Sequence, residues 1–381
     1  MIFTRNIEQQ LNKWIKSKEV IMIYGARQVG KTTFIKNYLK SKSHSILLNC
    51  ELPEVSEILS SLNVVRIKQL FGDNKTIALD EAQSISNIGL ILKLIYDEMG
   101  EYKIIATGSS SFDLSSHVAE ALTGRNIKFE MFPLSMDEIE KSKGNIQLVE
   151  LENETLIYGS YPEIVDIAFD RKQIKIRNLS SDYLFRDVLI HERIKSPDLV
   201  RTLLRALALQ IGSQVSHSEL ANILKVSRQT VIKYIELLEK SFIIFRLKSY
   251  SSNLRSEIKR SSKYYFYDIG IRNAIINNFA PISLRNDVGA IWENFCISER
   301  IKYLRNNGID KELFFWRSYD GAEIDLIEIK DQQIDAFEFK WRIKRKISIP
   351  KTFKEKYSPK SYKIVTRENY FQLNDSNTES L

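Results

Sequence analysis

The residues best suited to chemistry lie near the start of the 381-residue sequence and form a glycine-rich loop. Residues 25–32, GARQVGKT, match the pattern G-x-x-x-x-G-K-[ST], which binds nucleotide phosphates. Gly25 and Gly30 permit backbone conformations in which successive N–H groups turn toward one anion. Lys31 is expected to reach the β- and γ-phosphates, and the hydroxyl of Thr32 is expected to bind Mg²⁺.

The segments on either side of this loop support the same interpretation. An apolar run at 20–24 is typical of a buried strand, and residues 33–42 have a helical pattern. A chance match to the motif in a chain of this length is on the order of one per cent or less. The residues expected to contact the nucleotide are Gly25, Ala26, Arg27, Gln28, Val29, Gly30, Lys31, Thr32 and Thr33.

Polar residues follow two later apolar runs. Asp80 and Glu81 end the first run, where an aspartate can hold Mg²⁺ and a glutamate can polarise an attacking water. Adjacent acids at a strand end are otherwise solvated loop charges, but the phosphate-binding loop favours the functional interpretation. The second run is followed by Thr107, Ser109 and Ser110. Their hydroxyl groups could orient a water near the γ-phosphate, or the three residues could form a capped turn.

Arg125, in the segment LTGR, is a third kind of candidate. An arginine can stabilise the charge that develops during phosphoryl transfer, including at the site of a neighbouring copy. This hypothesis implies a homo-oligomer. The alternative is an arginine on the surface with no role in hydrolysis.

A second constellation of charged residues lies near the C-terminus. Asp325 falls in the strand-like run 323–327, and Glu338 and Lys340 share one face of the next run because side chains alternate along a strand. Glu293, on a preceding helix, could join them. Asp325 and Glu338 are predicted to hold Mg²⁺, with Lys340 assisting an attacking water or the developing charge. The alternative is an amphipathic sheet with outward-facing charges.

The elements that must position these groups can be predicted from the pattern of apolar residues. Strand-like runs at 20–24, 45–50, 76–81, 103–107 and 126–132 alternate with helical segments, which predicts a parallel sheet. Residues 141–158 are polar and locally helical and are predicted to link two domains. Residues 159–210 are predicted to be mostly helical.

Residues 216–267 have the pattern of a winged helix-turn-helix. Two short helical segments, 218–224 and 228–240, precede two strand-like runs. Three polar side chains are expected to face outward on the second helix, and the ribbon is basic, so DNA contact and protein docking both remain open. These residues are Arg228, Gln229 and Lys233 on the helix, and Arg246, Lys248, Arg255, Lys259 and Arg260 in the ribbon.

The last segment is predicted to contain a helix at 287–304, three strands and a densely basic stretch at 342–367. The lysines and arginines of this stretch alternate with aromatic residues, namely Trp341, Phe353, Tyr357 and Tyr362. This pattern is typical of a surface that binds a polyanion, and the alternative is a solvated basic face. Residues 371–381 are predicted to be a disordered tail.

The overall composition is that of an ordinary globular protein, with 43% hydrophobic residues and a formal net charge of +8. The positive charge weakly favours a polyanionic partner such as DNA. Two distant cysteines predict neither a disulfide framework nor a thiolate metal site, and we expect a cytoplasmic protein. No signal peptide or uncharged run of membrane-spanning length is visible, so no integral membrane contact is expected.

The motifs GARQVGKTT, IALDEAQ, ATGSSS and LTGRNIKFEMFPLS resemble the bacterial and archaeal P-loop ATPases of the AAA-related class. Members of this family usually carry a C-terminal domain of unknown function. The short segments 159–163 (GSYPE) and 183–187 (YLFRD) resemble motifs of the family's middle region. The resemblance implies ATP hydrolysis with ATP and Mg²⁺ as cofactors. The D…ExK pattern of Asp325, Glu338 and Lys340 resembles the core of restriction-endonuclease-like nucleases.

The predicted architecture is α/β in three domains. A parallel-sheet P-loop NTPase domain spans 1–140, a helical and winged helix-turn-helix domain 159–280, and an α/β restriction-endonuclease-like domain 283–370. The predicted function is a Mg²⁺-dependent ATPase whose nucleotide state controls basic modules acting on DNA, with or without cleavage. The alternatives are a signalling or assembly switch with a catalytically silent C-terminal domain, and a DNA-binding regulator.

Overall fold

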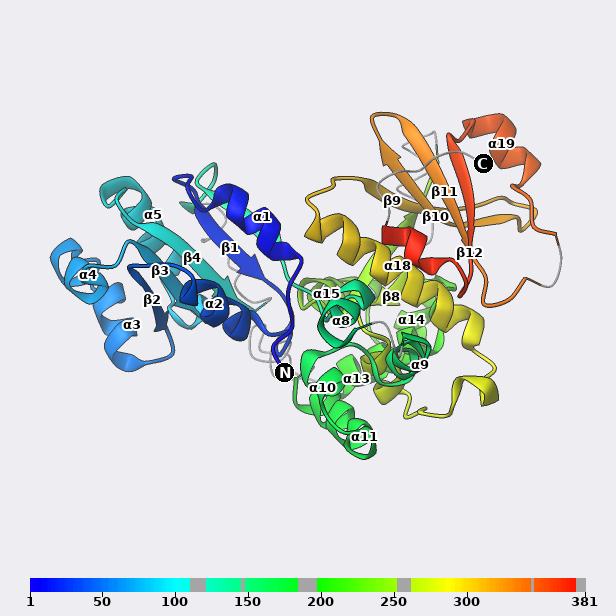
Figure 1. Cartoon of the computed structure of the whole chain (residues 1–381). Coiled ribbons are helices and arrows are strands. Elements are labelled where there is room, and N and C mark those ends of the chain that lie inside the picture. Colours follow the sequence, from blue (N-terminus) through cyan, green and yellow to red (C-terminus); the bar gives the residue numbers. More distant parts are fainter. Residues whose placement is uncertain (110–120, 145–147, 184–196, 252–261, 344–345, 375–381) are drawn as a thin grey trace.

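The computed structural model describes residues 1–109, 121–144, 148–183, 197–251, 262–343 and 346–374. Figure 1 shows an N-terminal lobe, residues 1–130, in blue and cyan on the left, and the remaining elements on the right. The lobe comprises α1 (Ile7–Trp14), β1 (Val20–Tyr24), α2 (Lys31–Lys40), β2 (Ser45–Asn49), α3 (Pro53–Ser60), α4 (Val64–Phe71), β3 (Thr76–Asp80), a 3₁₀ turn (Ala82–Ser84), α5 (Ile88–Glu98), β4 (Lys103–Gly108) and β5 (Asn126–Glu130). Helix α8 (Met136–Lys143) follows β5 and lies with the elements on the right (Figure 1).

The N-terminal lobe is built on a parallel sheet with strand order β2-β3-β4-β1-β5. The five predicted strands and their parallel pairing are confirmed. All five residues of β1 are buried, because the sheet is covered on both faces. Ile21 and Ile23 belong to the cluster that includes α1 and α2, whereas Met22 packs with the apolar residues of α3, α4 and α5. The central strand β1 is thereby fixed, and with it the loop that follows.

The rest of the chain begins with helices and continues into a second sheet. Its elements are α9 (Leu148–Tyr158), α10 (Pro162–Asp166), α11 (Phe169–Asn178), a π-helical turn (Leu179–Tyr183), α13 (Pro197–Leu209), β6 (Gln214–Val215), α14 (His217–Leu224), α15 (Arg228–Lys240), β7 (Ile244–Ser249), β8 (Ser262–Phe266), α17 (Ile269–Ile275), a 3₁₀ turn (Ile282–Leu284), α18 (Val288–Asn306), β9 (Glu312–Arg317), β10 (Glu323–Lys330), β11 (Gln333–Phe339), α19 (Lys351–Tyr357), β12 (Ser361–Val365) and a 3₁₀ turn (Tyr370–Asn374).

One seven-stranded sheet joins the two predicted C-terminal domains. Its strand order is β12-β11-β10-β9-β7-β8-β6, and β7 pairs in parallel with β9 through Lys248 and Ser249. The sequence analysis separated these parts between residues 280 and 283, but the backbone hydrogen bonds of the sheet cross that boundary. Short-range patterns could not predict this, because the pairing connects strands more than 60 residues apart.

Helix α18 is the central element of the C-terminal part and is buried on almost every side. The predicted helix is confirmed, but three of its charged residues, Glu299, Arg300 and Lys302, are buried inside the protein. Lys302 donates to the carbonyl of Leu134 at 3.0 Å, and Glu299 accepts the backbone N–H of Met136 at 2.8 Å. Arg300 forms a two-point ion pair with Glu328 at 2.5 and 2.9 Å. The helix therefore connects the segment that follows β5 to the second sheet.

Two further expectations differ from the structure. The predicted link at 141–158 includes α9, whose residues Leu151 and Leu156 are buried in the main core, so this segment is part of the packed fold. The predicted tail began at 371, but Leu373 is buried within the last 3₁₀ turn. Residues 375–381 lie outside the described part. Within the described ranges, no helix is both long enough and apolar enough to cross a membrane.

Candidate functional site

The loop between β1 and α2 has the geometry of an anion-binding loop. A Cβ atom on Gly25 would lie 2.1 Å from the carbonyl oxygen of Met131, so only glycine fits there. Gly30 precedes α2 with a φ of 95°, which glycine adopts without strain. The N–H groups at the start of α2 and the positive end of its dipole face the loop, where an anion is stabilised.

Lys31 lies beneath this loop and is almost fully buried. Its ammonium donates to the carbonyl oxygens of Gly25 and Ala26, each at 2.9 Å. A buried ammonium normally has anionic or carbonyl partners because its desolvation is costly. The loop thus holds the lysine close to the position in which it would meet a bound phosphate.

The start of α2 and the ends of β3 and β4 bring the other predicted residues to the same edge of the sheet. The hydroxyl of Thr32 donates to Oδ2 of Asp80 at 2.7 Å, and the hydroxyl of Thr107 donates to the second carboxylate oxygen, Oδ1. The Thr107 oxygen also accepts the backbone N–H of Glu81 at 3.3 Å. The predicted convergence of Thr32, Asp80, Glu81 and Thr107 is therefore present. Ser109 is buried at the end of β4, and Ser110 lies outside the described residues.

Glu81 has a backbone conformation that is uncommon for a side chain of its type. Its φ of 51° lies in the left-handed region, directly after the last residue of β3. Such strain is found most often at functional sites. The amide of Gln83 donates to the Glu81 carboxylate, a contact that the sequence analysis did not anticipate. The motif DEAQ contains both residues, so the spacing was visible even though the contact was not.

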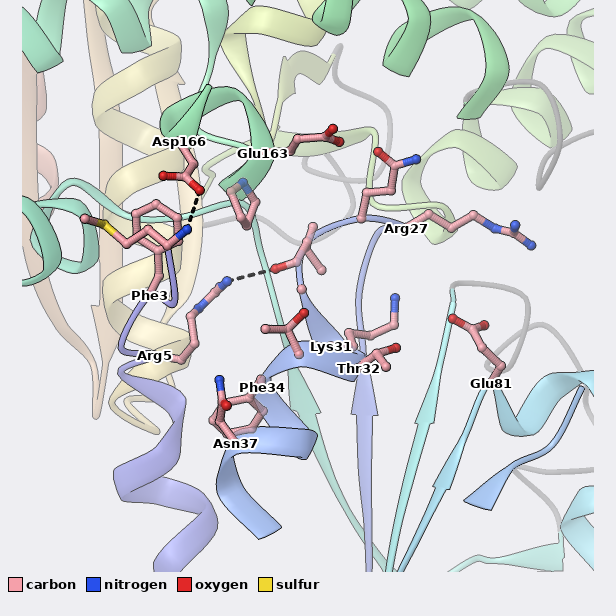
Figure 2. A pocket seen from close by; sticks show the side chains of 16 residues that line it. Phe3, Arg5, Arg27, Lys31, Thr32, Phe34, Asn37, Glu81, Glu163 and Asp166 are labelled. Atoms are coloured by element: carbon pink, nitrogen blue, oxygen red, sulfur yellow. Dashed lines mark hydrogen bonds and ion pairs between the residues drawn. The ribbon is translucent and has the colours of Figure 1, made fainter. Parts of the chain in front are cut away.

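A cavity of about 510 Å³ opens beside the loop and has walls from two parts of the chain (Figure 2). One wall is the loop with Lys31 and Thr32, and Glu81 lies at the far side. The opposite wall is α10, from which Glu163 and Asp166 project. The sequence analysis noted the segment 159–163 as a family-like motif but assigned it no role in the site.

Arg5 fixes the third side of the cavity, and no pattern in the sequence pointed to it. Its guanidinium donates to the carbonyls of Val29 at 2.9 Å and Phe132 at 2.6 Å, and it pairs with Glu138 at 3.2 Å. Glu138 also forms the capping box that starts α8. The buried arginine therefore ties the phosphate-binding loop to the segment that leaves the sheet.

Arg125 lies far from this cavity within its own chain. Its backbone carbonyl accepts the N–H of Val20, so it flanks the amino-terminal ends of β1 and β5, whereas the loop is at the carboxyl-terminal end. Its side chain pairs with Asp97 at 3.1 Å and lies over the ring of Tyr96. Parallel β1 and β5 put Arg125 at the edge of the sheet opposite to the loop, so it does not reach the cavity of its own chain, and a role at the site of a neighbouring copy stays a prediction.

The predicted C-terminal constellation is brought together in the structure. The ammonium of Lys340 lies 2.5 Å from Oε1 of Glu338 and 3.5 Å from Oδ2 of Asp325. Glu293, from α18, accepts hydrogen bonds from Lys263 at 3.0 Å and Tyr265 at 2.6 Å. Lys263 and Tyr265 belong to β8, and the sequence analysis did not include them.

Burial and mutual repulsion control the acidity of these carboxyl groups. Burial raises the pKa of Glu338 to about 7, the Asp325 charge adds to the rise, and Lys340 opposes it. Burial likewise raises the pKa of Glu293 to about 7, with a further rise from Asp325 and an opposing effect of Lys263. Burial would lower the pKa of Lys340, but Asp325 and Glu338 together raise it. The cluster is therefore a strongly coupled group of buried charges.

The described residues offer no ready-made metal cage. Within them, no three His, Cys, Asp or Glu side chains form a group that could hold a metal ion. At the loop, Thr32 and Asp80 provide the few protein oxygens that Mg²⁺ typically takes beside phosphates and water. At the C-terminal cluster, the carboxylates of Asp325 and Glu338 share one lysine partner, Lys340.

The expected nucleic-acid surfaces are exposed in part. Arg228, Gln229 and Lys233 are exposed on α15, as predicted. Arg246 pairs with Glu239 at 3.3 Å, and Lys248 is exposed on β7. Arg255, Lys259 and Arg260 lie outside the described residues, as do Lys344, Arg345 and residues 184–187 of the YLFRD segment.

The aromatic residues of the basic stretch differ from the expectation. Phe353 is fully buried against Trp316, with ring centroids 5.1 Å apart, and is a core residue of α19. Trp341 packs against Trp292 and under the guanidinium of Arg367. The lysines of α19 remain exposed, so the stretch has a basic surface, whereas Phe353 and Trp341 serve packing.

Comparison with known protein families divides the chain into three parts. Residues 17–140 match a family described as AAA domain. Residues 149–281 and 288–379 each match a domain of unknown function, DUF8612 and DUF4143 respectively. These limits agree with a nucleotide-binding lobe followed by two further units.

Similar proteins are found in archaea and bacteria. An uncharacterized protein of Methanocaldococcus jannaschii is 29% identical over 358 residues, covering 86% of this chain and 75% of that protein. An uncharacterized protein of Haemophilus influenzae is 26% identical over 296 residues, covering 72% and 74%. AMPPCP-bound DnaA from Aquifex aeolicus has 18% identity and a TM-score of 0.29, covering 61% of this chain and 86% of that one. The chain therefore combines an AAA-type P-loop domain with two C-terminal domains of unknown function.

Proposed function

We propose that the protein binds and hydrolyses ATP at the loop of residues 25–32. The observation that carries this proposal is the hydrogen-bonded chain Thr32–Asp80–Thr107, which lies beside the loop and Lys31 at one edge of the sheet. The match of residues 17–140 to AAA domains supports it. The cavity of about 510 Å³ provides room on the side of the loop where a nucleotide would extend.

Each residue has a distinct role in this proposal. Backbone N–H groups of the loop and of the start of α2 bind the phosphate oxygens, and Lys31 turns from the loop carbonyls toward the β- and γ-phosphates. Thr32 and Asp80 would hold Mg²⁺, which neutralises phosphate charge when bound. Glu81 accepts a proton from the attacking water, and Thr107 fixes the backbone that carries Glu81.

The position of α10 suggests what hydrolysis controls. Pro162, Glu163 and Asp166 line the cavity, so the nucleotide would contact both the AAA domain and the segment that leads to the C-terminal part. A change in phosphate content at the loop alters what α10 packs against. We infer that nucleotide state adjusts the position of the C-terminal domains relative to the AAA domain.

Steady-state hydrolysis of ATP tests the proposal. Glu81→Gln keeps the size of the side chain but removes the base, so kcat should fall by at least about 100-fold while ATP affinity is retained. Lys31→Ala should lose binding as well as turnover. Lys36→Ala, an exposed lysine on the same helix, is the matched control and should resemble the wild type. Wild-type turnover in Glu81→Gln would refute Glu81 as the base.

A second candidate function is action on DNA by the C-terminal part. Three observations favour it: the order of α13, β6, α14, α15, β7 and β8, which suits a winged helix; the exposed basic start of α15; and the convergence of Asp325, Glu338 and Lys340. In this proposal α15 contacts DNA, and the carboxylate cluster holds Mg²⁺ near a phosphate.

DNA binding and cleavage are measured separately. Arg228→Ala and Lys233→Ala should weaken DNA binding and reduce its salt dependence, because each phosphate contact that is lost lowers the slope by about one. Asp325→Asn should abolish any Mg²⁺-dependent cleavage without changing DNA affinity. If the wild type binds DNA but does not cut it, the C-terminal domain is catalytically silent, which favours the regulator or the switch alternative. DNA affinity that ignores salt contradicts the phosphate contacts.

A further inference from the structure

One guanidinium group contacts three segments that border the phosphate-binding loop. Arg5 lies just before α1, is 6% exposed and lines the cavity beside the loop. Its Nη1 donates to the carbonyl of Val29 in the loop at 2.9 Å, and its Nη2 donates to the carbonyl of Phe132 after β5 at 2.6 Å. Its Nε donates to Oε1 of Glu138 on α8 at 3.2 Å. The planar fork of an arginine can make these three contacts at once, whereas the ammonium of a lysine is a single point charge.

The contact with Val29 sets the direction of the N–H group that follows it. The peptide between Val29 and Gly30 is trans, so its carbonyl and its N–H point in opposite directions. Arg5 approaches the loop from one side, and Lys31 lies on the other side (Figure 2). The N–H of Gly30 is therefore turned toward the side of Lys31, and it has no hydrogen-bond acceptor among the described residues. Such a donor at the wall of the cavity is available to bind a phosphate oxygen.

Glu138 connects this contact to the C-terminal part of the chain. It is fully buried in the first turn of α8, where its Oε1 accepts the backbone N–H of Asn6 at 2.9 Å as well as Nε of Arg5. Its second oxygen closes the capping box at the start of α8. In the same turn, the N–H of Met136 donates to Glu299 of α18 at 2.8 Å. Buried hydrogen bonds therefore lead from α18 through α8 to Arg5 and the loop.

We propose that Arg5 orients the peptide between Val29 and Gly30 for phosphate binding, and that Glu138 makes this orientation depend on the position of α8. When α8 shifts against the N-terminal lobe, Glu138 draws the guanidinium away and the Val29 carbonyl loses its donor. The Gly30 N–H is then free to turn from the phosphate. A bound phosphate acts in reverse, because it fixes the peptide and, through it, Arg5 and α8. This inference rests on the proposed nucleotide site and adds a route of control that is separate from the cavity wall formed by α10.

Calorimetric titration of the full-length protein with Mg²⁺ and pyrophosphate tests the positioning role. Arg5→Met keeps an apolar stem but removes the three donors, so pyrophosphate affinity should fall roughly tenfold, as expected for one misdirected charge-assisted hydrogen bond. ADP affinity should fall by the same factor, because only phosphate contacts are affected. Arg66→Met, which changes an exposed arginine of α4, is the matched control and should bind like the wild type. Unchanged pyrophosphate affinity in Arg5→Met, or a loss confined to ADP, overturns the proposal.

Glu138→Gln tests the action of α8 from a distance. Glu138 is not among the residues that line the cavity, and glutamine keeps its size while weakening its hold on Arg5. Pyrophosphate affinity should fall several-fold in this variant. The double variant Arg5→Met/Glu138→Gln should bind no worse than Arg5→Met alone, because Glu138 acts through Arg5. Glu54→Gln, at an exposed glutamate of α3, is the control. Wild-type affinity in Glu138→Gln, or losses that add in the double variant, contradict the proposal.

Thermal unfolding separates the positioning role from a general loss of stability. Arg5→Met leaves the buried Glu138 carboxylate without its cationic partner, so the melting temperature should fall. The double variant also removes that charge and should melt closer to the wild type, while its pyrophosphate affinity stays as low as that of Arg5→Met. Recovery of affinity together with stability would show that Arg5 only stabilises the fold, and would refute the proposal.

Amide hydrogen exchange measures the effect in the reverse direction. Mg²⁺ and pyrophosphate should slow exchange in α8 of the wild type but not of Arg5→Met, at a concentration that saturates both proteins. Equal protection of α8 in the two proteins contradicts coupling through Arg5. A wild type that binds neither ADP nor pyrophosphate would refute the proposed nucleotide site and this inference with it. Normal binding that is unaffected by Arg5→Met and Glu138→Gln would refute this inference alone.

Discussion

Gly25 shows how one residue constrains the nucleotide site. Its backbone passes so close to Met131 that a Cβ atom would lie 2.1 Å from a carbonyl oxygen. Met131 directly follows β5, and its N–H in turn donates to the carbonyl of Tyr24 at 2.7 Å. The first glycine of the motif is thus required by packing between two strand ends as well as by the anion.

Gly25→Ala tests this constraint. The added methyl group must displace a backbone carbonyl, so we expect a loss of about 1–3 kcal/mol in the free energy of unfolding and weaker nucleotide binding. Gly289→Ala is the control, because a Cβ there meets nothing within 4 Å and alanine favours a helix. Chemical denaturation compares the two variants. A Gly25→Ala protein as stable as the control would refute the constraint.

At the scale of single elements, α18 is the helix on which the C-terminal part is assembled. Asn294 bonds both the N–H and the carbonyl of Phe266, and Ser298 bonds the carbonyl of Tyr267, so the helix is fixed to β8 and the residue after it. Asp287 stands directly before the helix and accepts hydrogen bonds from Arg272 at 2.6 Å and Arg285 at 2.8 Å. These contacts fix the start of α18 against α17.

The pKa of Asp287 gives this junction a testable pH dependence. Burial alone would raise it, but hydrogen bonds from Arg285 and Arg272 lower it to about 2. A carboxyl group with a depressed pKa stabilises the fold above its unfolded pKa of about 4, and the contribution is lost as pH falls toward 2. Asp287→Asn should therefore cost about 2 kcal/mol at pH 7, and the difference should narrow below pH 4.

Urea denaturation at several pH values measures this difference. Asp320→Asn, which changes an exposed aspartate, serves as the control and should be neutral throughout. A penalty for Asp287→Asn that stays constant from pH 7 to pH 3 would show that the carboxylate charge is not what fixes the junction.

At the scale of the whole molecule, the cavity beside the loop of residues 25–32 and the C-terminal part meet at residues 158–162. Ser160 donates its backbone N–H to Asp268 at 2.7 Å, and its hydroxyl accepts from Lys302 of α18 at 3.3 Å. Two residues later, Pro162 lines the cavity. One short segment therefore contacts the cavity, α17 and α18, which is the arrangement that nucleotide control of the C-terminal domains requires.

Amide hydrogen exchange tests this coupling. Adding Mg²⁺ and ATP should slow exchange in α10 and in the loop of residues 25–32, because both lie against the bound nucleotide. Lys31→Ala should show neither change. Protection of the loop alone, with α10 unaffected, would mean that nucleotide is sensed only within the AAA domain.

Sequence patterns predicted the parts of the site that are local. The motif 25–32, the strand ending at Asp80 and the pair Glu81 and Thr107 follow from short spacings and from the rule that parallel strands share one edge. The end of the sheet that Arg125 occupies could not be predicted from its chain position, and its role at the site of a neighbouring copy stays a prediction.

Contacts between distant segments escaped the sequence analysis. Arg5 pairs with Glu138, 133 residues away, and Lys263 pairs with Glu293, 30 residues away. The residues of α10 line a cavity with a loop far earlier in the chain. No local sequence pattern encodes contacts across such separations. The buried charges of α18 were missed for a related reason. Glu299, Arg300 and Lys302 read as surface residues until their partners in other elements are known.

The account depends most on nucleotide binding at the loop of residues 25–32, and calorimetric titration with Mg²⁺ and ATP measures it most directly. We predict one nucleotide bound per chain by the wild type and by Lys36→Ala, with binding lost in Lys31→Ala. Absence of binding heat in the wild type, or undiminished binding by Lys31→Ala, would contradict the assignment of this loop as the nucleotide site.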